Sequence, residues 1–314
     1  MQNSKSYRGR IRQVPIYLGK CFRAFIFMDD WKVIPMAAII GGLVSFVACR
    51  NMFKYMETTV SGGLAMVFVC IWNGFFNSIQ VICRERDVIK REHRSGMHIT
   101  SYIAAHMIYQ AFICMLQVTV LIFISGVSGI EFPLTGVITR SFIIDYWITL
   151  FLITYSADML SLMISAIAPN PTAAMTVMPF VLIIQLVCSG VMFQLAGGTE
   201  IITKFTVSRW GMEALCSIGN YNSLPMMGLW NQLFKFRSFE LIEGIRPVEE
   251  ITNYMMDNNL TEEFMLQSGQ YSQNVNYLST PLHVLNCWGV LILMAVVTAF
   301  VAVIFLKNID RDKR

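Results

Sequence analysis

Apolar residues gather into six long runs that are separated by shorter polar segments. A hydrocarbon core about 30 Å thick is crossed by roughly 20 apolar residues in helical conformation. The runs are continuous and do not alternate with polar residues, which favours helices over the strands of a membrane barrel. We therefore predict six transmembrane helices, over residues 33–49, 60–83, 100–127, 141–168, 173–195 and 283–306.

The composition agrees with this pattern. Hydrophobic residues make up 55% of the 314 residues, and charged residues only 14%. A soluble globular protein carries roughly 25% charged residues, so this chain has too few charges to cover a surface exposed to water. Intrinsic disorder is excluded as well, because it requires low hydrophobicity and high charge. The fold class predicted is an all-α integral membrane protein.

The distribution of charge predicts the topology. Basic residues cluster before the first run, between the second and third, and after the sixth, whereas residues 196–282 carry more acidic than basic residues. Cytoplasmic loops are enriched in Lys and Arg. We therefore expect a multi-pass protein of the plasma membrane with both termini in the cytoplasm and residues 196–282 outside.

This topology divides the chain into four parts. Residues 1–32 are expected to form a cytoplasmic amphipathic connecting helix, because apolar residues such as Val14, Leu18 and Phe22 recur at helical spacing among basic ones. Residues 33–195 hold helices one to five, with a coupling loop at 84–97. Residues 196–282 form an extracytoplasmic loop region that includes a helix-like stretch at 248–265, and residues 283–314 hold the sixth helix and a cytoplasmic tail.

The loop at 84–97 has the most informative pattern of charge. Charges of both signs alternate along it, and Gly96 is a typical helix stop. A short charged helix on the cytoplasmic surface would offer ion pairs to a soluble partner, and the alternative is an ordinary basic loop beside a membrane span. The candidate coupling residues are Glu85, Arg86, Arg91, Glu92 and Gly96.

Motifs for catalysis or for binding ATP are not visible in the sequence. It has no Gly-rich phosphate-binding loop, no His-Glu-x-x-His zinc motif and no Gly-x-Ser-x-Gly nucleophile elbow. We therefore expect no catalytic, cofactor or metal site on this chain, and no nucleic-acid partner.

Three stretches resemble one transporter family. The first is Arg-Glu-His-Arg-Ser-Gly-Met at 91–97, which is followed by Ser101 and Tyr102. The others are Ala-Ile-Ala-Pro-Asn at 166–170, and Ser-Gly at 189–190 with Ser-Arg-Trp-Gly-Met-Glu-Ala-Leu at 208–215. In this order the chain resembles the membrane domain of ABCG-type (White-family) ABC exporters.

The resemblance implies partners and a fold. It implies the six-helix ABCG-type exporter fold, a second copy of this chain or a homologous permease, and contact with membrane lipid. It also implies an ABC ATPase subunit or domain that binds ATP and Mg. The nucleotide-binding domain that the family usually carries in the same chain is not visible in this sequence, so we expect a bacterial permease with a separate ATPase subunit.

Candidate residues for the substrate pathway lie on the second and fourth runs. Asn73, Phe76, Asn77 and Gln80 share one helical face, and in the family this part of span two lines a central cavity. Asp158 is an acid deep in span four. A carboxylate at that depth must be paired with another group, in contact with water, or protonated. Hydrogen bonds that only hold the bundle together are the alternative for both sets.

The family also implies an outer gate just after the Ser-Gly of span five. The matching residues are Val191, Met192 and Phe193, and such an apolar constriction can block water and ions. The function predicted is export of an amphipathic or hydrophobic substrate (lipid, peptide or drug-like) by the membrane subunit of an ABC transporter. The alternatives are a non-transporting scaffold or sensor subunit, or a lipid-modifying membrane enzyme.

Overall fold

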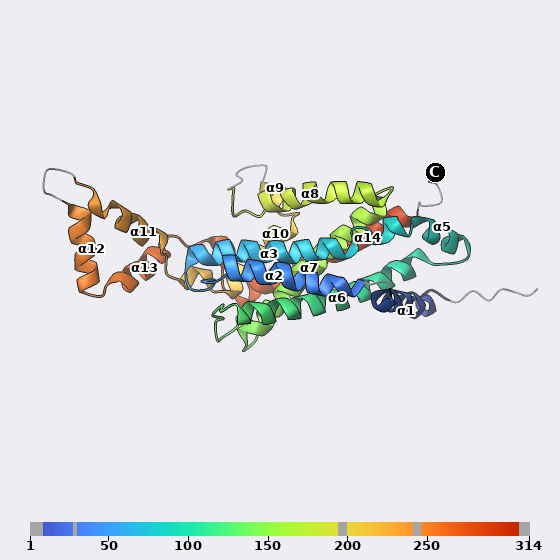
Figure 1. The fold of residues 1–314 in the computed structure, drawn as a ribbon, viewed down its shortest axis with the longest axis horizontal. Helices are drawn as coiled ribbons and strands as arrows, with labels where there is room; N and C mark the ends of the chain where they lie inside the picture. The colour runs from blue at the N-terminus through green and yellow to red at the C-terminus, as the bar shows by residue number, and fades with distance from the viewer. Residues whose placement is uncertain (1–8, 28–29, 194–199, 241–245, 308–314) are drawn as a thin grey trace, which may run out of the picture.

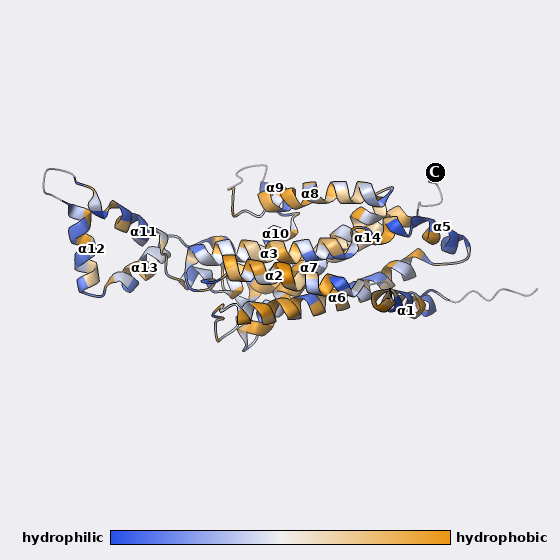
Figure 2. Cartoon of the chain, viewed as in Figure 1, coloured by the Kyte–Doolittle hydropathy of each residue, from blue (hydrophilic) through white to orange (hydrophobic). Residues whose placement is uncertain are grey.

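The molecule is elongated (Figure 1), with a helical bundle between two polar ends (Figure 2). The computed structural model describes residues 9–27, 30–193, 200–240 and 246–307. One end carries a small helical lobe made of α11 (Gly228–Lys235), α12 (Pro247–Asp257) and α13 (Thr261–Gln270). The opposite end carries α1 (Arg10–Phe27) and the short helix α5 (Arg86–Arg94). We refer to these as the lobe end and the α5 end.

Long apolar helices form the bundle, which confirms the predicted helical membrane fold. Among the described residues, four helices are long and apolar enough to cross a membrane, counting α3 and α4 as one, and two shorter apolar helices accompany them. The four are α3 (Met56–Ser78) with α4 (Val81–Arg84), α6 (Ile99–Val127), α7 (Phe142–Ile167) and α14 (Pro281–Lys307). The shorter two are α2 (Val33–Ala48) and α8 (Pro171–Val187).

Two predicted segments differ from the helices in the structure, one by an interruption and one by an earlier end. The second is interrupted between Ser78 and Val81, where the Ser165 hydroxyl of α7 accepts hydrogen bonds from the backbone N–H groups of Ile82 (3.0 Å) and Cys83 (3.2 Å). The fifth stops at Val187, before a turn in which Gly190 has a positive φ of 76°. The rest of that segment, residues 194–195, lies outside the described residues.

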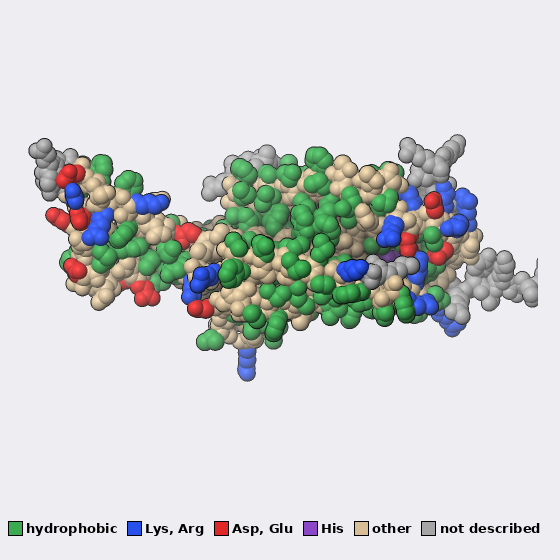
Figure 3. Space-filling model, viewed as in Figure 1, with side chains coloured by type: hydrophobic (Ala, Val, Ile, Leu, Met, Phe, Trp, Pro, Cys, Tyr) green, Lys and Arg blue, Asp and Glu red, His purple; other side chains and the backbone are tan. Residues whose placement is uncertain are grey.

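Helix α7 is the centre of the bundle. In its most apolar stretch, 72% of the residues are buried inside the structure, whereas in the corresponding stretch of α14 only 28% are buried. Large apolar side chains on the outer helices, such as Ile39, Phe180 and Phe300, are exposed, and they form an apolar belt between the two polar ends (Figures 2 and 3). Exposed apolar surface of this extent suits a lipid environment.

A glycine permits a close approach between α3 and α7. A Cβ atom on Gly74 would lie 2.8 Å from the backbone nitrogen of Asp158 and 3.0 Å from the Cβ of Ala157, and closer still to the carbonyl oxygen of Thr154. Small residues let helix backbones approach and gain dispersion contacts in membranes. Gly74 therefore sets the spacing of the two most extensively packed helices.

A buried helix of the bundle comes before the lobe in the chain. The buried helix is α10 (Val207–Ile218), which packs against α3, α7 and α14. The backbone N–H groups of Met227 (3.1 Å) and Gly228 (2.6 Å) donate to Glu57 of α3 and tie the lobe to the bundle. The lobe helices are α11 (Gly228–Lys235), α12 (Pro247–Asp257) and α13 (Thr261–Gln270).

The helix-like stretch expected over 248–265 forms two helices. Helix α12 ends at Asp257 and α13 begins at Thr261. Asn259 between them adopts a left-handed φ of 54°, a conformation that Asn tolerates better than most residues. The turn lets the two helices fold back toward α11 (Figure 1).

We predict that Gly74→Ala destabilises the bundle, because the new methyl group meets backbone atoms that cannot move independently. Overpacking of this kind costs about 1–3 kcal/mol, so the melting temperature in detergent should fall clearly. Gly289→Ala on α14 is the matched control, since a Cβ there meets no atom within 4 Å. Equal melting temperatures for the two variants would contradict the assignment.

Candidate functional site

Helix α5 (Arg86–Arg94) has one buried face and one exposed, charged face. Ile89 is fully buried against Ile82 and Tyr102 in the apolar cluster at this end. Asp87, Arg91 and Arg94 are exposed and lie four and three residues apart, so they share the opposite face. The helix therefore presents charges outward while it is fixed to the bundle by its apolar side.

Polar contacts brace α5 against α7 and α1. The Arg86 guanidinium donates to the carbonyl oxygens of Ala168 (2.8 Å) and Ala166 (3.3 Å) at the end of α7. A cation is favourable at a helix C-terminus, where carbonyl groups lack intrahelical partners. On the other side, Lys20 of α1 (Arg10–Phe27) forms an ion pair with Glu85 at 2.9 Å.

One glutamine fixes the turn that follows α5. The side-chain amide of Gln13 in α1 donates to the carbonyl oxygen of Gly96 (3.1 Å) and accepts from the backbone N–H of His98 (2.9 Å). Gly96 has a φ of 103°, which favours glycine. Helix α1 thus holds both the start and the end of the α5 segment.

Glu92 faces inward, toward Tyr17 of α1. Burial raises the pKa of the Tyr17 hydroxyl to about 12, and the Glu92 carboxylate beside it contributes to the increase. The hydroxyl therefore remains protonated and can donate to Glu92. The ring of Tyr17 also packs edge-on against Tyr102 of α6, with centroids 5.8 Å apart.

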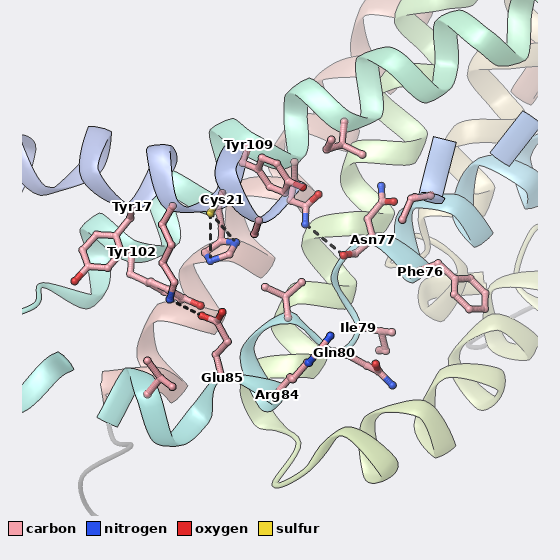
Figure 4. Close-up of a pocket in the computed structure, with 18 of the residues that line it drawn as sticks. Tyr17, Cys21, Phe76, Asn77, Ile79, Gln80, Arg84, Glu85, Tyr102 and Tyr109 are labelled. Atoms are coloured by element: carbon pink, nitrogen blue, oxygen red, sulfur yellow. Dashed lines mark hydrogen bonds and ion pairs between the residues drawn. The ribbon is translucent and has the colours of Figure 1, made fainter. Parts of the chain in front are cut away.

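A cavity of about 510 Å³ lies beside this brace (Figure 4). Helices α1, α3, α4 and α6 supply most of its lining, and Met175 of α8 adds to it. The lining is mainly apolar and aromatic, with a few polar groups, as is typical of sites for organic ligands. The polar residues among them are Lys20, Asn77, Gln80, Arg84, Glu85, His106 and Gln110.

Behind the cavity, amide side chains join α3 to α6. Asn77 and Gln117 exchange two hydrogen bonds of 2.9 Å each. The Cys114 thiol lies 3.7 Å from the Asn77 amide nitrogen and donates to Asp158 Oδ2 at 3.4 Å. Asp158 is fully buried, so its contacts lie within this layer of α3, α6 and α7.

The structure brings together only some of the expected pathway residues. Phe76, Asn77 and Gln80 line the cavity, whereas Asn73 and Asp158 are buried and do not belong to the lining. At the far end of α8, Val191 packs partly against the core. Met192 and Phe193 follow it and are 56% and 52% exposed.

Sequence reasoning missed several lining residues. His106 and Gln110 lie one turn apart on α6 and both face the cavity, and their polar spacing within an apolar run could have revealed them. Tyr17 and Lys20 lacked such a signal, because only the packing of α1 against α6 brings them to the cavity.

Comparison with known families identifies the chain. The sequence model of the family described as ABC-2 type transporter matches residues 18–218, which is more than half of the chain. The chain belongs to the ABC-2 type transporter family. No curated protein matches the chain significantly.

Membership confirms the resemblance to ABCG-type permeases and gives the chain its class. In ABC-2 type transporters this domain is the membrane permease, and a partner ATPase binds ATP. The matched residues run from α1 to the end of α10. They therefore include α5, every lining residue of the cavity except Tyr17, and the turn after α8 of this ABC-2 type transporter.

We predict that Asn77→Leu destabilises the protein, since it leaves the buried Gln117 amide without this partner. The cost should be about 1–2 kcal/mol, measured as a lower melting temperature in detergent. The double variant Asn77→Leu/Gln117→Leu removes both polar groups and should recover most of the loss. A double variant that is destabilised by the sum of the single effects would contradict this coupling.

Proposed function

We propose that this chain is the membrane subunit of an ATP-driven exporter that moves an amphipathic or hydrophobic substrate out of the cytoplasm or the inner leaflet. The observation that carries the proposal is the joint position of α5 and the cavity. The ion pair that braces α5, Lys20 with Glu85, is also part of the cavity wall. A force on α5 would therefore act directly on the space that could hold a substrate.

In this proposal the α5 end is cytoplasmic, as the basic residues around it indicate. Helices α2 and α8 are the first and fifth of six spans. At 16 and 17 residues each is about 25 Å long, and the adjoining turns and a slightly thinned bilayer make up the difference. Both termini are then cytoplasmic, and the lobe lies outside.

The partner ATPase would dock on the exposed face of α5, with Asp87, Arg91 and Arg94 as its contacts. ATP and Mg bind to that partner. Glu85, Arg86 and Glu92 act on the inner side, where they transmit the movement of α5 to α1 and α7. Ile89, which is buried, keeps the helix from sliding over the bundle surface.

The cavity favours substrates with an apolar body and a polar group. Rings of Tyr17, Phe76 and Tyr109 offer apolar contact, and Gln80 and Gln110 offer hydrogen bonds. Lipids, hydrophobic peptides and drug-like molecules all fit this description. Asn73 and Asp158 support the lining from behind, through the α3–α7 contact and the amide layer.

A second membrane domain, either another copy of this chain or a homologous permease, would complete the pathway. An ABC transporter needs two membrane domains, and six spans per chain supply one. The exposed Met192 and Phe193, together with Val191, would meet their counterparts across the pathway and form an apolar gate at the outer side.

The docking surface is tested by reversing one exposed charge. We expect Arg91→Glu to reduce substrate-stimulated ATPase activity and transport at least about tenfold, because placing like charges together at an interface costs several kcal/mol. The measurement uses the complex of this chain with its ATPase in lipid vesicles. Arg140→Glu, an exposed residue before α7, is the matched control. Full coupling in the Arg91→Glu complex would overturn the proposal.

The gate is tested by Val191→Ala/Met192→Ala. We expect higher basal ATPase activity and fewer substrate molecules moved per ATP, because smaller side chains loosen the constriction. Polar replacements should act more strongly, since they admit water. Met178→Ala on α8, the helix that precedes this turn, changes a buried position and is the control that lowers only the melting temperature. Unchanged transport per ATP in the double variant would argue decisively against the gate.

A further inference from the structure

Three side chains that can bind a metal converge where α10 meets α14. Glu213 comes from α10, and His283 and Cys287 lie one turn apart on α14. One ligand atom from each lies within 4.8 Å of the others. Neither the substrate cavity nor the α5 brace includes these residues.

The distances suit a shared ion. Cys287 Sγ lies 3.8 Å from His283 Nε2. In a tetrahedral zinc site the bonds to sulfur and nitrogen are about 2.3 and 2.0 Å long, which places the two ligand atoms roughly 3.5 Å apart. A small rotation of the Glu213 side chain would bring its carboxylate into the same range.

Neighbouring groups contact two of these ligands. Arg209 Nε donates to Glu213 Oε1 at 2.9 Å, so Oε2 is a second oxygen that a metal can use. The carbonyl oxygen of Asn276 lies 2.9 Å from His283 Nε2 and accepts a hydrogen bond from it when Nε2 is protonated. A metal on Nε2 replaces that hydrogen bond, and the carbonyl oxygen is then a further oxygen ligand beside it. The hydrogen bond from Arg209 fixes the position of the Glu213 carboxylate, as such partners do in metal sites.

The three residues of the cluster differ in burial. Cys287 is fully buried and Glu213 nearly so, whereas His283 is half-buried, near the start of α14 at the lobe end. An ion could thus enter past His283 and be shielded by α10. Such a mixed sulfur, nitrogen and oxygen donor set favours zinc over calcium or magnesium.

We propose that Glu213, His283 and Cys287 form a binding site for a divalent ion of the zinc class, which links α10 to α14. Binding releases the Cys287 thiol proton and moves the His283 proton to Nδ1, so that a thiolate and Nε2 become ligands. The ion connects two helices that are far apart in sequence and stiffens the lobe end of the permease.

The test is metal binding by the purified, untagged full chain in detergent. We expect about one zinc ion per chain by mass spectrometry, and a thiolate-to-cobalt charge-transfer band when Co²⁺ replaces it. Zn²⁺ should also raise the melting temperature, because it binds only the folded state. Wild-type protein that binds neither ion, or whose cobalt spectrum lacks the thiolate band, overturns the proposal.

Variants identify the ligands. Cys287→Ser should abolish the charge-transfer band, and His283→Ala should abolish the rise in melting temperature with Zn²⁺. Cys49→Ser is the matched control, because a serine hydroxyl there can still donate to the carbonyl oxygen of Gly62, 3.5 Å from the thiol. Retention of the band in Cys287→Ser, or its loss in Cys49→Ser, would place the metal elsewhere and overturn the assignment.

Discussion

The close contact of α3 with α7 is the constraint on which the rest of the bundle depends. Lipid offers no hydrophobic force between helices, so their association relies on packing and on hydrogen bonds between them. Gly74 allows the backbones to meet, and α14 then joins α7 through polar contacts. Ser156 donates to the carbonyl oxygen of Leu291 (2.9 Å), and the Trp288 indole donates to the Thr149 hydroxyl (2.9 Å). Each of these contacts needs α7 at the position that α3 gives it.

The same helix pair explains why the charged end can be rigid. Where α3 stops and α4 begins, backbone N–H groups lose their helical partners, and a buried unpaired group costs about 1–3 kcal/mol. Ser165 of α7 accepts from two of them, and Arg86 returns hydrogen bonds to the last carbonyl groups of α7. The unpaired N–H groups at the break before α4 and the unpaired carbonyl groups at the end of α7 are therefore hydrogen-bonded through Ser165 and Arg86. These hydrogen bonds hold the start of α5 in place.

The sequence predicted the membrane helices well, because long apolar runs suffice for that purpose. It could not place the break before Val81, since the cause is Ser165, which lies far along the chain and on another helix. Helical spacing put Asn73 and Phe76 on one face, yet Asn73 is buried and Phe76 is exposed to the cavity. The side of α3 that faces α7 is set by Gly74, and no periodicity reveals that. The residues of α1 at the cavity, and the convergence of Glu213 with α14, likewise depend on tertiary packing alone.

The position of the cavity follows from these constraints. It lies between a layer of paired amides, Asn77 with Gln117, and the ion pair of Lys20 with Glu85. The amide pair is held within the bundle on both sides, so that wall is costly to move. The ion pair is about one-third exposed, and exposed ion pairs contribute only about 0–1 kcal/mol, so this wall can open at low cost. If a partner ATPase displaces α5, the cavity should therefore change shape first at its α1 side, while the amide layer keeps the bundle closed behind it.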